Sequence, residues 1–121
     1  METNGFLIKI VVIGLLGLQY LVHYGENFAS SGHLYLTRIP GITVEQRNEI
    51  ITKMAEQGVA TNVHYKPLPM MTAYRNLGFD IDDYPNAYNQ YCNEVSLPLH
   101  TCLTDEQVDY VIENFVEIIN N

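Results

Sequence analysis

The chain has 121 residues, 47% of them apolar, which is enough for one modest hydrophobic core and too short for a second complete domain. Six basic residues face fourteen acidic ones, so the net charge is -8 and no Lys/Arg cluster is present to bind nucleic acid. Cys92 and Cys102 form no CxxC pair, so they suggest neither a disulfide framework nor a zinc knuckle, and a reducing, cytoplasmic location fits best.

The N-terminal part of the chain is unusually apolar. Between Phe6 and Val22 only Lys9 and Gln19 interrupt the apolar run. As a helix this run falls just short of a bilayer core, and it lacks the basic start of a signal peptide. It is therefore expected to be buried or to face a partner, with a membrane anchor as the less favoured alternative.

From residue 30 onward, predicted strands and helices alternate. Segments rich in β-branched and aromatic residues predict strands within 32–39, 59–65 and 95–99. Helices are expected after the capping boxes at Thr43 and Thr104, around 71–77, and from Pro85. This alternation predicts a small sheet with helices packed largely on one side, an α+β or open α/β sandwich. The apolar segment before residue 23 is expected either to cover a sheet edge or to add a strand.

Four segments resemble, in the same order, segments of the DegT/DnrJ/EryC1/StrS aminotransferases. They read His-Leu-Tyr, Gly-Val-Ala-Thr-Asn-Val-His-Tyr-Lys-Pro-Leu, Ser-Leu-Pro-Leu and Leu-Thr-Asp-Glu-Gln, at positions 33–35, 58–68, 96–99 and 103–107. The resemblance covers about residues 30–119. It implies the small C-terminal domain of a fold-type I aminotransferase: an α+β fold with a mostly antiparallel sheet of three to four strands and helices mainly on one face.

The same resemblance implies a division of the chain. Residues 1–24 are expected to be an apolar N-terminal segment whose first part is not native family sequence, because the family usually has a charged amphipathic helix there. Residues 25–121 are expected to form the aminotransferase C-terminal small domain. The chain is then a fragment of a longer enzyme.

Family members carry pyridoxal phosphate on a lysine of a large domain and move an amino group onto a keto sugar attached to a nucleotide. Such reactions supply amino sugars and cell-surface polysaccharides, and most of the enzymes are homodimers. The resemblance thus implies a nucleotide-sugar substrate, a homodimer, and a chain that is inactive and cofactor-free on its own. The alternative is a stand-alone interaction or dimerisation module that uses the apolar N-terminal segment.

The resemblance also selects His64, Tyr65 and Lys66 as substrate-binding residues. His64 is expected to contact the sugar, and Tyr65 and Lys66 to shape the pocket or the approach of the phosphates. Adjacent residues of a regular strand point to opposite faces, so only one of His64 and Tyr65 is expected to face a given pocket, unless a bend at Pro67 changes this arrangement. The alternative is a structural histidine beside a core tyrosine with a wet hydroxyl.

No catalytic residue and no metal site are predicted. Lys66 has the chemistry of a Schiff-base amine, but the family's cofactor lysine lies in the large domain. Pro69 stands where many family members have a second histidine. Arg38 is open to two interpretations, contact with an amino donor's carboxylate or an ordinary surface ion pair.

Overall fold

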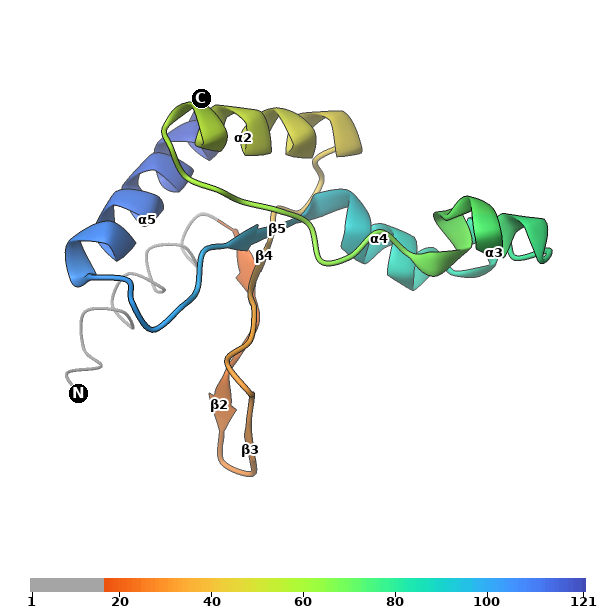
Figure 1. Cartoon of the computed structure of the whole chain (residues 1–121), viewed down its shortest axis with the longest axis horizontal. Helices are drawn as coiled ribbons and strands as arrows, with labels where there is room; N and C mark the ends of the chain where they lie inside the picture. The colour runs from red at the N-terminus through yellow and green to blue at the C-terminus, as the bar shows by residue number, and fades with distance from the viewer. Residues whose placement is uncertain (1–16) are drawn as a thin grey trace.

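A computed structural model describes residues 17–121 of the chain. Its main sheet is antiparallel and has three strands in the order β1-β4-β5, with β1 at Gln19–Tyr20, β4 at Tyr35–Arg38 and β5 at Glu94–Leu97. A separate hairpin, β2 (Tyr24–Gly25) and β3 (Phe28–Ala29), extends away from this sheet (Figure 1). The expected α+β fold with a small antiparallel sheet is confirmed.

The two longest helices begin at the predicted capping boxes. Helix α2 (Val44–Glu56) follows Thr43, and α5 (Asp105–Asn120) follows Thr104. In each box the threonine hydroxyl accepts the backbone N–H of the glutamine three residues later, and that glutamine side chain accepts the threonine N–H. These bonds satisfy N–H groups that have no partner inside the helix, which explains why the sequence locates both helix starts.

The core lies where α2 and α5 pack against each other and α2 meets β5. Met54, Val95 and Phe115 are completely buried in it. Thr37 is equally buried, and its hydroxyl donates to the carbonyl of Val95 at 2.6 Å, so this polar group has a partner inside the core. Partly buried apolar residues of α5 also pack against this core, so one face of the last helix is directed toward it.

One predicted strand is wrong. Residues 59–65 form no strand and make only an isolated antiparallel bridge between Asn62 and Ser96 of β5. Side-chain oxygens take the next two backbone donors: Val63 N–H donates to Asn62 Oδ1 at 2.8 Å, and His64 N–H donates to Glu94 Oε2 at 2.9 Å. The ladder with β5 ends at Asn62 because the next donor on that side, His64 N–H, is bonded to the Glu94 side chain and not to a backbone carbonyl of β5.

The third strand of the sheet comes instead from the N-terminal side. Gln19 pairs with Arg38, and Tyr20 with Thr37. The alternative that the apolar segment adds a strand is thus confirmed for its last residues, while the part of that segment before residue 17 lies outside the described residues. The division at residues 24 and 25 stays a prediction.

Residues 66–84 extend from this core, and we call them the arm. The arm contains the short helices η1 (Leu68–Met70), α3 (Thr72–Asn76) and η2 (Ile81–Asp83), and α4 (Pro85–Asn93) leads from it back to β5. None of its residues is buried, and Figure 1 shows α3 far from α2 and α5. Several large apolar residues of the arm are exposed; they are Leu68, Met71, Leu77, Phe79 and Tyr84.

Candidate functional site

His64 is held by two buried polar side chains of β5. Its backbone N–H donates to Glu94 Oε2 at 2.9 Å, and its ring Nδ1 lies 2.8 Å from the Ser96 hydroxyl. The same hydroxyl donates to the other carboxylate oxygen, Glu94 Oε1. Glu94 is 1% exposed and Ser96 is 4% exposed, so a closed polar network inside the domain fixes the position of His64.

This network also sets the tautomer of His64. The Ser96 hydroxyl has one proton, which it directs to Glu94, so Nδ1 must be the donor in its bond to Ser96. In the neutral imidazole the proton is then on Nδ1, and Nε2 keeps a lone pair. His64 can therefore accept a hydrogen bond or a proton at Nε2 from a ligand.

A hollow of about 190 Å³ lies beside His64. Its polar lining comes from His33, Asn62, His64 and Ser96, and its apolar lining comes from Leu34, Ala60, Leu97, Pro98 and Leu99. His64 is half-buried and lies between the polar network and this hollow. The arrangement suits a residue that contacts a small polar group at the rim of a cleft.

Tyr65 does not point away from His64 as a regular strand would require. The two rings meet edge to face with centroids 4.7 Å apart, and the peptide bond between them is cis. The expectation of opposite faces is wrong because the backbone here is not a strand. Tyr65 is 68% exposed, so the alternative of a core tyrosine is also wrong.

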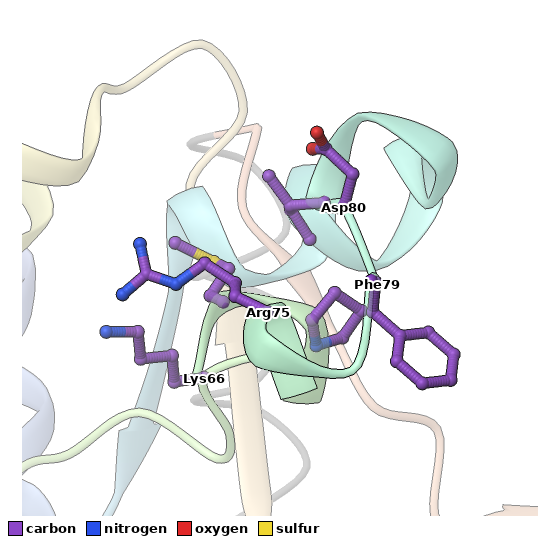
Figure 2. A pocket seen from close by; sticks show the side chains of 8 residues that line it. Lys66, Arg75, Phe79 and Asp80 are labelled. Carbon is purple, nitrogen blue, oxygen red and sulfur yellow. The ribbon is translucent and has the colours of Figure 1, made fainter. Parts of the chain in front are cut away.

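Lys66 belongs to a different hollow, of about 600 Å³, that opens on the arm. Figure 2 shows Lys66 and Arg75 with their side chains ending on the same side of the view, whereas the Asp80 carboxylate points elsewhere. The remaining lining residues are Pro69, Met70, Gly78, Phe79 and Ile81. The structure thus brings His64 and Tyr65 together and directs Lys66 to a neighbouring pocket.

The two lysines among residues 17–121 do not have the surroundings of a cofactor lysine. Lys53 pairs with Glu49 on the surface of α2 at 3.0 Å, and Lys66 is exposed. Schiff-base chemistry calls for a desolvated or otherwise activated amine, which neither position provides. The described residues therefore do not fit pyridoxal phosphate, and no chemical step on this chain is derived from it; that the chain alone binds none stays a prediction.

Other candidates have simpler roles. Arg38 donates through Nε to Asn93 Oδ1 at 3.0 Å and through Nη2 to the Asn89 carbonyl, which ties α4 to the sheet. Within residues 17–121, no group of three His, Cys, Asp or Glu side chains is placed to hold a metal ion. No helix in this part of the chain combines the length and apolarity needed to cross a bilayer.

The sequence did not predict a role in a site for Glu94, Ser96 or Arg75. A usable signal existed for Glu94, since a carboxylate next to the strand predicted within 95–99 is costly to bury unless it is bonded. Nothing in the local sequence links Ser96 to His64 or Arg75 to Lys66. Both pairs depend on the tertiary path of the chain.

Solved structures that share this fold include aminotransferases. The Streptococcus pneumoniae protein Spr1654, described as a sugar aminotransferase, matches with a TM-score of 0.90 and 47% identity in its PMP form, over 97% of this chain and 29% of that one. It has also been solved in a PLP form. The Helicobacter pylori aminotransferase PseC, at 23% identity and a TM-score of 0.80, shows the same fold.

Sequence comparison agrees. The family model for the DegT/DnrJ/EryC1/StrS aminotransferase family matches residues 14–116, and the chain belongs to this family. The Bacillus subtilis spore coat polysaccharide biosynthesis protein SpsC is 34% identical over 93 residues, which are 72% of this chain and 23% of SpsC. The chain thus spans about a quarter of that relative's length.

Proposed function

We propose that this chain is the C-terminal small domain of a pyridoxal-phosphate-dependent aminotransferase that acts on a nucleotide-linked keto sugar. The observation that carries the proposal is the match of 97% of the chain to a sugar aminotransferase at a TM-score of 0.90. In this proposal the enzyme serves amino-sugar or cell-surface polysaccharide biosynthesis in the cytoplasm. It is a homodimer, and its cofactor lysine is on a large domain.

His64 is the residue we assign to the sugar. The network of Glu94 and Ser96 supports this role because it orients the imidazole without using Nε2. A sugar hydroxyl donating to Nε2 would find an acceptor whose position is already set, so little conformational entropy is lost on binding. Tyr65, whose ring contacts that of His64, would cover one side of the sugar.

The proposal predicts that the chain alone does not transaminate. The direct test is a chimera in which residues 17–121 replace the matching segment of Spr1654, with which they share 47% identity. The chimera is expected to take up the cofactor, seen as its visible absorbance, and to transfer an amino group from glutamate to a nucleotide-linked keto sugar. The isolated chain is expected to do neither.

Two variants test the assignment of His64 within the chimera. His64→Asn is expected to lower kcat/KM by about 10²-fold or more, as loss of a positioned polar contact does. His100→Asn, a change at an exposed histidine, is the matched control and is expected to leave kcat/KM unchanged. An isolated chain that transaminates would contradict the proposed function. An H64N chimera with the same kcat/KM as the parent chimera would contradict the assignment of His64.

The oligomeric state distinguishes this proposal from the alternative of a stand-alone interaction module. If the apolar N-terminal segment mediates self-association, light scattering will show a smaller particle for a chain that starts at Gly25 than for the full chain. Sedimentation with lipid vesicles tests for a membrane anchor, since in that case the full chain would sediment with the vesicles and the chain that starts at Gly25 would not.

A further inference from the structure

The basic residues of the described chain divide into two groups. Three have partners inside the domain: Arg38 bonds to Asn93, Arg47 lies over the ring of Tyr91 with its guanidinium carbon 4.7 Å from the centroid, and Lys53 pairs with Glu49. The other two, Lys66 and Arg75, have no ion pair or side-chain hydrogen bond within residues 17–121. Both line the hollow on the arm.

Two basic residues that have no ion pair within residues 17–121 and line the same hollow are unexpected in a chain with a net charge of -8. Fourteen acidic residues are available, and in an acidic chain a surface cation is easily paired. Instead both uncommitted cations face one open pocket. Two like charges on one pocket repel each other unless an anion lies between them.

The acidic residue of this pocket does not neutralise them. Asp80 Oδ1 accepts the backbone N–H of Asp82 at 3.0 Å and so caps the short helix η2. In Figure 2 its carboxylate points away from the ends of Lys66 and Arg75. Asp82 and Asp83 follow on η2 and are exposed.

Local structure fixes where the two cations lie. Lys66 comes directly after the His64–Tyr65 pair and before Pro67, whose ring restricts the backbone. Arg75 is in the last turn of α3, and Gly78 reverses the chain just after it with a φ of +91°. Local structure therefore sets the backbone positions from which both side chains reach the pocket.

We propose that Lys66 and Arg75 form a subsite for the diphosphate group of the nucleotide-linked ligand. This inference deepens the proposed function and rests on it for the identity of the ligand. Arg75 supplies a planar set of N–H donors that matches phosphate oxygens, and Lys66 supplies a compact point charge. Because Lys66 follows His64 by two residues, a diphosphate at this subsite would lie beside a sugar held at His64.

Binding measured on the full 121-residue chain tests the subsite without any need for cofactor or transamination. Isothermal titration calorimetry at low ionic strength would use inorganic pyrophosphate, uridine 5′-diphosphate, inorganic phosphate and uridine. Pyrophosphate and the nucleoside diphosphate are expected to bind, inorganic phosphate about tenfold more weakly or worse, and uridine not at all. Added salt is expected to weaken binding, since both cations are exposed to solvent.

Three variants locate the binding. Lys66→Gln and Arg75→Gln are each expected to raise the Kd for pyrophosphate about tenfold, as loss of one charge-assisted hydrogen bond does. Lys53→Gln removes a cation that already has a partner, so it is the matched control and is expected to leave the Kd unchanged. Circular dichroism of each variant checks that it is folded.

The test of the subsite and the test of the proposed function can fail independently of each other. No binding of pyrophosphate, equal binding of phosphate and pyrophosphate, or an equal effect of all three variants would overturn the subsite. If the chimera transaminates and the subsite fails, the proposed function stands without it. If pyrophosphate binds through Lys66 and Arg75 but the chimera is inactive, the subsite stands and the proposed function fails.

Discussion

The core and the arm of this domain are organised by different forces. In the core, α2, α5 and the sheet bury Met54, Val95 and Phe115 completely, and even the polar Glu94 and Thr37 have partners there. The arm buries no residue and keeps its shape through local turns, capping bonds and contacts between neighbours such as Tyr74 and Phe79. Burial therefore supplies most of the stability of the core, whereas the arm depends on local contacts and is expected to be the less stable of the two.

The largest expected effect contrasts two phenylalanines. Phe115→Ala is expected to lower the free energy of unfolding by about 3–5 kcal/mol, because the completely buried ring leaves a cavity. Phe79→Ala in the arm, where the ring is 43% exposed, is expected to cost less than about 1 kcal/mol. Urea unfolding followed by circular dichroism measures both, and equal losses would show that the arm is part of the core.

The next effect tests the polar network beneath the candidate site. Glu94→Gln is expected to destabilise the domain by about 2 kcal/mol, because an amide N–H₂ replaces one of the two oxygens that accept from His64 N–H and Ser96 O–H. The matched change Glu49→Gln removes only an exposed ion pair and is expected to cost less than about 0.5 kcal/mol. The same unfolding assay compares them, and a neutral E94Q would mean that the network does not hold His64.

A third effect lies in the alkaline range. Burial, with a smaller contribution from Tyr20, raises the pKa of Tyr35 to about 12 from its ordinary value of 10.0. Between these values the unfolded chain loses the phenol proton and the folded chain keeps it, so stability falls as the pH rises from about 10 to about 12. Allowing for solvent screening, the loss is up to about 2 kcal/mol.

Tyr35→Phe removes this titration, so the stability of the variant is expected to fall less steeply than that of the parent chain over the same pH range. Tyr24→Phe changes an exposed ring of the hairpin and is the control. Thermal melts at pH 9, 10 and 11 give the slopes. Parallel curves for the parent chain and Y35F would rule out a buried phenol in the core.

The smallest effect sharpens the description of the arm. Gly78 has a φ of +91°, a conformation that alanine adopts only at a cost of about 1 kcal/mol, although a Cβ there would meet no neighbour. Gly78→Ala is therefore expected to lower the hydrogen-exchange protection of α3 several-fold and to leave α5 unchanged. Gly41→Ala, also at a positive φ but outside the arm, is the control and is expected to leave the protection of α3 unchanged. A parallel loss in α5 would mean that arm and core unfold as one unit.

Local chemistry in the sequence determined much of this protein. The capping boxes at Thr43 and Thr104 predicted where α2 and α5 begin. Each box consists of hydrogen bonds between two residues three positions apart, so it needs no distant partner. Alternating elements predicted the α+β class, and the four family segments identified the family that the family model confirms. These signals are short-range or contiguous, so a single sequence contains them in full.

Tertiary structure decided the rest, because the remaining contacts join residues far apart in the chain. The expected strand over 59–65 is absent because Glu94, 30 residues beyond His64, takes the backbone donor that a ladder would use. Whether Lys66 shares a pocket with His64 or with Arg75 depended equally on the path of the arm. Propensity and spacing describe what a segment favours by itself, but only the folded chain determines which distant side chain competes for its hydrogen bonds.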